Sequence, residues 1–255
     1  MSLTSLIVRK AAPPPKIESF SSYLFVGPHP DDIEIGAGAT IARLSEQKKK
    51  ISFLICMDGR FGLELAPKGI TPENLAELRR QESTEGAKKL GVDDVRFLNL
   101  SDGGFYDPKE LRDGIARVIG EVQPEIVFAP DPSVKSECHT DHLNVGEAVR
   151  RLAFFAPFPD IMAGYGAKSV PVAAAAFYMT ADPNRFVKTA GYGNKQLEAI
   201  RCHASQFPEG SDALKQLELY LKIREITFGL RSLKGKAEGF RVLGKTQMHC
   251  LPEAG

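Results

Sequence analysis

Short apolar runs alternate with longer amphipathic segments as far as residue 155, and this alternation constrains the fold more than any other feature. The apolar runs predict buried strands over residues 23–26, 51–57, 95–100 and 126–129. The segments between and after them predict helices over residues 38–49, 72–90, 108–122 and 141–155. Strand and helix repeating at this spacing indicate a parallel sheet with right-handed crossovers, so we expect an α/β fold.

The pattern is less regular beyond residue 155. It predicts a strand over residues 170–179, helices over 195–203 and 212–228, and short terminal strands over 239–242 and 246–250. The chain shows no internal repeat, no low-complexity segment and no clear linker. We therefore expect a single domain over residues 1–255, with an extended N-terminal arm over residues 1–18 and a C-terminal α+β extension.

The composition gives no reason to expect nucleic acid or a membrane as a partner. The formal net charge is only +1, and no stretch approaches the roughly 18 apolar residues that a spanning helix needs. The first residues do not resemble a signal peptide, because the apolar run is short and the basic residues follow it. The four cysteines form no CxxC pair, so we expect reduced thiols and a cytoplasmic location.

Two clusters of histidine and aspartate follow strands of the predicted sheet. One is residues 29–32, directly after the first strand, and the other is residues 139–142, after the fourth strand. In an open α/β sheet, ligands bind beyond the carboxyl ends of the strands, at the point where the strand order reverses. In the commonest strand order that point lies between the first and fourth strands, so we expect the two clusters to face each other.

The side chains of these clusters match a catalytic metal site. A catalytic zinc typically has three protein ligands and one open position, and His29, Asp32 and His142 would supply two imidazoles and a carboxylate. Asp31 would remain beside the metal, where a carboxylate can accept a proton from water. His139, one helical turn from His142, could donate a hydrogen bond to the oxyanion of a tetrahedral intermediate.

Other interpretations of the same residues carry less weight. Asp141 could hold one imidazole in the right tautomer, as outer carboxylates usually do, or it could simply cap a helix. Cys138 is a conceivable thiolate ligand, although a free cysteine usually behaves as a small hydrophobe. Gly36 and Gly38 hint at a dinucleotide-binding turn, but Ile41 replaces the third glycine and two carboxylates stand where a pyrophosphate would bind.

At these residues the sequence resembles the PIG-L/LmbE-like family of metal-dependent sugar de-N-acetylases. The resemblance rests on His-Pro-Asp-Asp at residues 29–32 and His-x-Asp-His at residues 139–142. It extends over most of the chain through Arg-x-x-Glu at residues 79–82 and His-x-Ser-Gln at residues 203–206. Within the family, the sequence is most similar to the diacetylchitobiose deacetylases. The resemblance implies a Rossmann-like three-layer sandwich, with Zn²⁺ as the usual cofactor and other divalent metals possible.

The resemblance also implies roles for particular residues. It matches His29, Asp32 and His142 to the metal ligands, Asp31 to the general base and His139 to the acid on the oxyanion side. The related enzymes are often trimers or hexamers, which implies a homo-oligomer.

The resemblance implies less specific roles for some further residues. The resemblance matches Arg79 to a substrate-binding arginine, Asp102 to a carboxylate that holds sugar hydroxyls, and His249 to a histidine that approaches the substrate. His203 could support the site, contact substrate, or be a hydrogen-bonded structural histidine. One departure is Ile33, which follows the first motif where the family often has glutamate.

The predicted function is a zinc-dependent hydrolase that removes the N-acetyl group from a GlcNAc-type sugar, such as diacetylchitobiose, and releases acetate. Two alternatives stay open. A non-haem iron oxygenase also uses two histidines and one carboxylate, but it needs no adjacent free aspartate. A non-catalytic sugar-binding protein would bind N-acetylglucosamine without releasing acetate.

Overall fold

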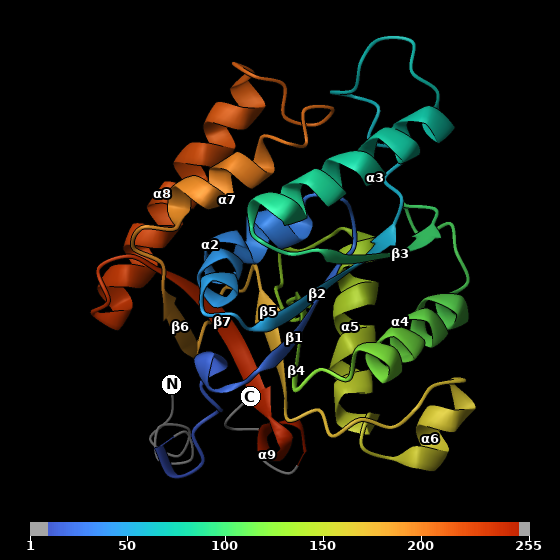
Figure 1. Ribbon diagram of the computed structural model, residues 1–255, viewed down its shortest axis with the longest axis vertical. Helices are drawn as coiled ribbons and strands as arrows, with labels where there is room; N and C mark the ends of the chain where they lie inside the picture. Colours follow the sequence, from blue (N-terminus) through green and yellow to red (C-terminus); the bar gives the residue numbers. More distant parts are fainter. Residues whose placement is uncertain (1–9, 250–255) are drawn as a thin grey trace.

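The structure, a computed structural model, describes residues 10–249 and centres on one seven-stranded sheet (Figure 1). The strand order is β3-β2-β1-β4-β5-β7-β6. The strands are β1 (Ser22–Gly27), β2 (Lys50–Met57), β3 (Asp94–Leu100), β4 (Ile126–Pro130), β5 (Ala174–Tyr178), β6 (Arg185–Lys188) and β7 (Ala237–Gly244). The first four lie where the sequence predicts them, with their ends within about a residue.

The first five strands run parallel, and the last two complete the sheet at one edge. β7 pairs antiparallel with β5, and β6 pairs antiparallel with β7. The strand order reverses at β1, which pairs with β2 on one side and β4 on the other. This confirms the expected α/β fold with a mostly parallel sheet, and it puts the ligand-binding edge between the carboxyl ends of β1 and β4.

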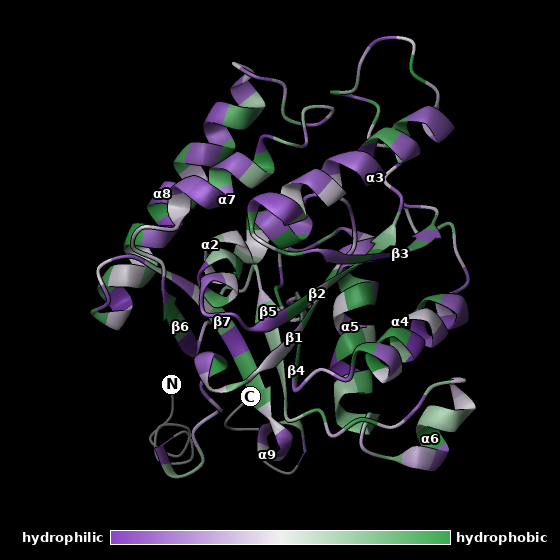
Figure 2. Cartoon of the chain, viewed as in Figure 1, coloured by the Kyte–Doolittle hydropathy of each residue, from purple (hydrophilic) through white to green (hydrophobic). Residues whose placement is uncertain are grey.

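Helices cover both faces of this sheet, as the three-layer expectation requires. The helices are η1 (Ile17–Ser19), α2 (Asp32–Glu46), α3 (Pro72–Lys89), α4 (Pro108–Val122), α5 (Thr140–Phe155), α6 (Pro159–Gly164), α7 (Gly193–Ile200), α8 (Asp212–Ser232) and α9 (Lys245–Met248). One core lies between the sheet and α4 and α5, and the other between the sheet and α2, α3 and α7. Figure 2 shows hydrophobic residues gathered in the central strands and on α5.

The core under α2 depends on aromatic packing and on the close approach of α2 to the sheet. The Phe25 and Phe128 rings stack with their centroids 4.2 Å apart on neighbouring strands. Gly36 lies directly over the Tyr178 ring, where an added Cβ would collide with the ring carbons. Gly36 therefore lets α2 approach β5.

Three details differ from the sequence expectations. α2 begins at Asp32 and not near residue 38, because the helix starts within the His-Pro-Asp-Asp motif itself. The terminal strand expected over residues 246–250 is instead the short helix α9 as far as residue 248, where the Gln247 side chain accepts a hydrogen bond from the Gly244 amide at 3.0 Å. The short elements β6 and α6 were not predicted.

The N-terminal arm is described only in part, since residues 1–9 lie outside the described residues. Residues 12–16 are irregular, and the Arg185 side chain donates to the Pro15 carbonyl at 3.2 Å. Within residues 10–249, no helix has the length and apolar character to span a bilayer. The expectation of a single domain over the whole chain stays a prediction.

Candidate metal centre

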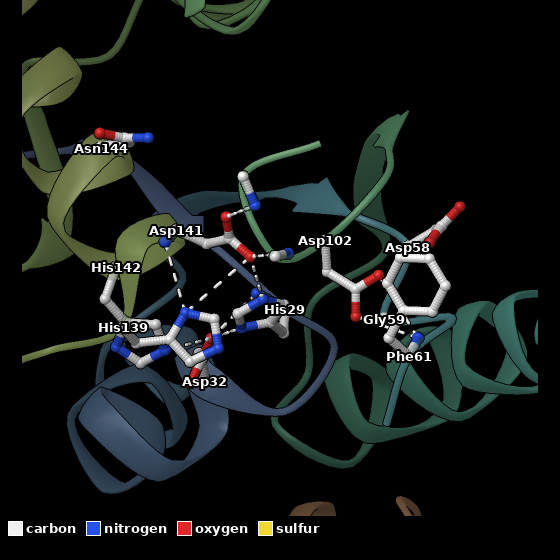
Figure 3. Close-up of polar contacts among 12 residues, drawn as sticks. His29, Asp32, Asp58, Gly59, Phe61, Asp102, His139, Asp141, His142 and Asn144 are labelled. Atoms are coloured by element: carbon white, nitrogen blue, oxygen red, sulfur yellow. Dashed lines mark hydrogen bonds and ion pairs between the residues drawn. The ribbon is translucent and has the colours of Figure 1, made fainter. Parts of the chain in front are cut away.

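The two histidine–aspartate clusters meet at the carboxyl ends of β1 and β4 (Figure 3). The first cluster follows β1, and the second lies at the start of α5, after the loop that leaves β4. The ligand atoms of His29, Asp32 and His142 all lie within 4.8 Å of one another. The topology thus brings together residues more than a hundred positions apart, at the edge where the sequence analysis expected them.

Asp32 links the two clusters. Its Oδ2 lies 3.2 Å from His29 Nδ1 and 3.4 Å from His142 Nε2. The same oxygen accepts a hydrogen bond from the His29 backbone N–H at 2.9 Å, which fixes the turn. Two imidazole nitrogens and a carboxylate oxygen therefore converge on one point, which is the donor set of a catalytic zinc site.

His29 has a carboxylate at each ring nitrogen. Nδ1 faces Asp32, and Nε2 lies 2.9 Å from Asp141 Oδ2. Burial lowers the pKa of His29, but its hydrogen bonds to Asp141 and Asp32 outweigh this and raise the pKa to about 10. The two carboxylates thus favour positive charge around His29, which a divalent metal would supply, and the two imidazoles and one carboxylate are donors that suit such a metal.

Asp141 is fixed by the loop that follows β3. Its Oδ2 accepts from the Gly103 N–H at 2.7 Å and its Oδ1 from the Gly104 N–H at 2.9 Å. Burial raises the pKa of Asp141, but the bond to His29 and these amides outweigh this and hold the pKa below its ordinary value. His29, His139 and Asp141 also have ligand atoms within 4.8 Å, but the oxygens of Asp141 are already engaged. Asp141 is therefore the outer carboxylate behind His29.

A second outer carboxylate lies behind His142. Glu137 Oε2 is 3.4 Å from His142 Nδ1, and Glu137 Oε1 accepts the His139 backbone N–H at 2.8 Å. His142 thus has Asp32 at one ring nitrogen and Glu137 at the other, as metal-binding histidines usually do. Sequence reasoning missed Glu137, and the only available signal was an acidic residue two positions before the second motif.

Asp31 lies beside this donor set in a strained backbone conformation. Its φ is 108°, a region that non-glycine residues rarely adopt and that is often retained at functional sites. Arg79 Nη2 donates to Asp31 Oδ2 at 3.1 Å and to the Pro30 carbonyl at 2.7 Å. Burial raises the pKa of Asp31 to about 6, against the opposing charge of Arg79.

Arg79, which the resemblance matches to a substrate-binding arginine, is buried behind Asp31, and its contact with substrate stays a prediction. Only 6% of its side chain is exposed, and its Nη1 also donates to the Gly59 carbonyl at 3.0 Å. Gly59 has a φ of 72° and leaves no room for a Cβ beside the guanidinium. These contacts make Arg79 a positioning residue that holds Asp31 and the loop around it.

His139 is half exposed at the mouth of the cluster. Its Nδ1 accepts a hydrogen bond from the Asp141 backbone N–H at 3.3 Å, which leaves the proton of a neutral ring on Nε2. Burial lowers the pKa of His139, and the neighbouring His29 and His142 lower it further. His139 therefore offers a neutral ring N–H donor next to the donor set.

Two other predicted residues are buried nearby. The Asp102 carboxylate accepts the Phe61 backbone N–H at 3.1 Å, so it holds a loop (Figure 3). His203 Nε2 lies 3.2 Å from Glu34 Oε1 on α2. Burial lowers the pKa of His203, but Glu34 outweighs it, so the pKa is raised. His203 thus supports the helix that carries Asp32.

The structure does not bring His249 to the cluster. Its ring centroid lies 5.5 Å from that of Phe154, near the opposite end of α5 from His142. The expected contact between His249 and substrate stays a prediction. Cys138 is exposed and its thiol is not in either group of possible ligands.

Comparisons with known proteins agree with this geometry. The sequence profile of the family described as "PIG-L: GlcNAc-PI de-N-acetylase" matches residues 24–153, which include both clusters. A diacetylchitobiose deacetylase of Thermococcus kodakarensis is 34% identical over 236 residues, 91% of this chain and 86% of the relative. A 1D-myo-inositol 2-acetamido-2-deoxy-alpha-D-glucopyranoside deacetylase of Kineococcus radiotolerans is 33% identical over 196 residues, 66% of this chain and 54% of the relative.

A solved structure matches almost the whole chain. The N,N'-diacetylchitobiose deacetylase from Pyrococcus horikoshii, complexed with its inhibitor MPG, superposes with a TM-score of 0.85. It is 28% identical in sequence, and the match covers 98% of this chain and 96% of that chain. The similarity therefore extends to the C-terminal elements beyond the family profile.

Proposed function

Because this chain belongs to the PIG-L family, we propose that it hydrolyses the acetamido group of a GlcNAc-type sugar and releases acetate. The observation that carries the proposal is the convergence of His29, Asp32 and His142 beside Asp31, a carboxylate outside that donor set. The relatives described above are deacetylases of diacetylchitobiose and of a 2-acetamido-2-deoxy-glucopyranoside. Their shared chemistry is the hydrolysis of an amide on carbon 2 of a sugar.

We propose that His29, Asp32 and His142 hold a divalent metal, with Zn²⁺ as the first candidate. Two imidazoles and one carboxylate suit catalytic zinc, and the same donors also suit iron or cobalt. A divalent metal bound there supplies Lewis acidity, which activates water at neutral pH and polarises a carbonyl. Asp141 and Glu137 orient the two imidazoles from behind.

Asp31 is the proposed general base. It accepts a proton from the attacking water as the water oxygen forms a bond to the acetamide carbon, and Arg79 holds the carboxylate in place. His139 Nε2–H donates to the carbonyl oxygen as that oxygen becomes negative. The C–N bond then breaks, Asp31 or His139 gives a proton to the leaving nitrogen, and acetate and the free amine are released.

Acetate release from a panel of substrates tests this function. The panel contains N-acetylglucosamine, diacetylchitobiose, and N-acetylglucosaminyl conjugates of inositol and of malate. We expect equal amounts of acetate and free amine from at least one of them, lost after chelation and restored by metal. A product that requires dioxygen would favour the iron oxygenase, and binding without acetate release would favour a sugar-binding protein.

We also propose that two copies of the chain pair through α8, which lies at the outer edge of the molecule (Figure 1). Five large apolar side chains on α8 and its C-cap are between 41% and 95% exposed: Leu219, Ile223, Ile226, Leu230 and Leu233. They are spaced four, three, four and three residues apart, which is the spacing of the apolar residues through which two helices pack in a coiled coil. Two such seams would bury on the order of 1,000 Å², the area that a specific interface needs.

Sedimentation tests the pairing. A contact between identical helices is two-fold, so it fits a dimer or a hexamer and not an isolated trimer. Replacing Ile223 and Leu230 by lysine should lower the measured mass by dissociating this contact, whereas Ile161→Lys on α6 should not. A wild-type chain that sediments as a monomer or a trimer would rule out the pairing.

We propose a cytoplasmic enzyme whose partner is a small-molecule sugar, with neither nucleic acid nor a membrane involved. The described cysteines, Cys56, Cys138 and Cys202, are free thiols, which is typical of a reducing compartment. The net charge of +1 favours no polyanion. Fractionation of cells that produce the tagged chain checks the location.

A further inference from the structure

Two phenylalanine rings are exposed beside the candidate metal centre. Phe61, in the loop between β2 and α3, is 51% exposed, and Phe105, in the loop between β3 and α4, is 75% exposed. Their ring centroids lie 6.0 Å apart with the planes at 82°, so the rings meet edge to face. Exposed apolar groups that meet at the edge of a site often mark where a ligand binds.

Backbone hydrogen bonds connect both rings to the metal centre. The Phe61 N–H donates to the Asp102 carboxylate, which belongs to the same loop as Phe105. Phe105 directly follows Gly103 and Gly104, whose N–H groups bind Asp141. Since Asp141 contacts His29, these bonds connect the backbones of both loops to the donor set, and Figure 3 shows the Phe61–Asp102 contact among them.

We propose that Phe61 and Phe105 form a stacking platform for a second sugar ring, joined to the ring that carries the reacting acetamido group. This inference rests on the proposed deacetylase function and narrows its substrate class to N-acetylated oligosaccharides of at least two units. The platform would select for chain length, because a second ring linked to the reacting ring would add stacking contacts that a single N-acetylglucosamine lacks.

The surroundings of the rings favour a sugar over an acyl chain. A pyranose ring has apolar C–H faces and hydroxyl groups around its edge, so it needs an aromatic face next to polar groups. Arg60 precedes Phe61, and a third of its side chain is exposed while its Nε donates to Asp58 Oδ2 at 2.9 Å. This partly exposed ion pair therefore adjoins the apolar platform, and an acyl chain packed against it would remove it from water at a cost, whereas sugar hydroxyl groups can hydrogen-bond to it.

Substrate pairs that differ by one ring test the platform. Phe61→Leu and Phe105→Leu keep an apolar side chain and remove the aromatic face. Each should lower kcat/KM for diacetylchitobiose by about tenfold, mainly through KM, and should leave kcat/KM for N-acetylglucosamine within about twofold. Phe158→Leu, at an exposed phenylalanine on the far side of α5, is the matched control and should change neither value.

Each outcome decides one proposal or the other. If the leucine variants lower kcat/KM equally for both substrates, or for neither, the platform is overturned and the deacetylase function is unaffected. If the wild-type chain releases no acetate from any substrate, the function fails instead. Calorimetric titration of diacetylchitobiose into the wild type and the double leucine variant then decides the platform: weaker binding by the variant supports it, and equal binding overturns it.

Discussion

Two clusters of buried charge lie near the carboxyl end of β4, and they are balanced differently. Directly after β4, Asp131 accepts hydrogen bonds from Arg241 Nη2 at 2.6 Å and Nε at 2.9 Å, and from the Thr180 hydroxyl at 2.6 Å. One carboxylate there meets one guanidinium. In the candidate metal centre, the side chains that face Asp32 and Asp141 are chiefly imidazoles, and the His29 ring lies between the two carboxylates.

This difference separates a cluster that stabilises the fold from one that a cation completes. Burial raises the pKa of Asp131, but Arg241 outweighs it, so the carboxylate stays ionised with its charge matched. The metal centre has no lysine or arginine against Asp32 among its described contacts, since Arg79 pairs with Asp31. The Asp131 carboxylate has its cation within the chain, whereas Asp32 faces two imidazoles that can also serve as metal ligands.

The largest expected effect comes from removing a ligand. His142→Ala leaves two donors, so the variant should lose its metal on dialysis and lose roughly a thousandfold or more of its acetate-releasing activity. Metal content by mass spectrometry and acetate release measure this. His249→Ala, an imidazole outside the centre, is the matched control for metal content and should keep its metal. One equivalent of metal retained in His142→Ala would break the comparison.

Asp31→Asn should have the next largest effect. The amide cannot accept the proton of water, so activity should fall by about 10²–10⁴-fold. Asparagine tolerates positive φ nearly as well as aspartate, so the strained backbone should survive and the metal should remain. Exposed Asp93→Asn is the control. Wild-type turnover by Asp31→Asn would remove this residue from the mechanism.

Removing the cation of the Asp131 cluster should affect the stability of the fold and not the reaction. Arg241→Ala leaves Asp131 buried without its cation and should lower the free energy of unfolding by about 3–5 kcal/mol, as measured in urea. Metal content and turnover per folded molecule should stay unchanged. Lys88→Ala removes an exposed partner of Glu85 and should leave the free energy of unfolding almost unchanged, because water screens the pair.

The contribution of the Asp131–Arg241 pair to stability has a defined dependence on pH. The pKa of Asp131 is lowered, so its contribution to stability is present above its ordinary value of 3.8 and is lost as pH falls below that value. The stability difference between the wild type and Arg241→Ala should therefore shrink in acid. A difference that stays constant below pH 3.8 would contradict the charge-based explanation.

The sequence predicts the parts of the site that depend on topology. Residues 29–32 and 139–142 each follow a strand, and the order of a parallel sheet brings the ends of β1 and β4 together. Strand ends are recognisable because apolar runs stop abruptly at them. The pairing of His29, Asp32 and His142 therefore needed no knowledge of any loop.

The contacts made by loops were beyond sequence reasoning. Gly103 and Gly104 act through backbone amides, which any residue has, so no residue type marks them. Arg79 faces Asp31 because of the rotation of α3, and this a motif does not specify. His249 follows a helix that the pattern presented as a strand, and its approach to the substrate, which only the resemblance implies, stays a prediction.

Substituting Glu137 should have the smallest effect on metal binding, because Glu137 contacts the proposed ligand His142 and is not itself a proposed ligand. His142 Nδ1 is buried and makes no hydrogen bond within the described chain, and Glu137 Oε2 is 3.4 Å away, so charge and not hydrogen-bond geometry connects them. Glu137→Gln keeps the size of the side chain and removes its charge. The affinity for metal, measured by competition with a chelator, should fall about 10–100-fold.

The matched control is Glu147→Gln, which neutralises a carboxylate of α5 that pairs with Arg150 and Arg151. It should leave metal affinity unchanged, although it lies on the same helix as His142. Equal affinities in the two variants would mean that Asp141 alone supports the ligands from behind. In that case the imbalance of charge that distinguishes the metal centre from the Asp131 cluster resides in Asp32 and Asp141, and Glu137 only fixes the loop through the His139 amide.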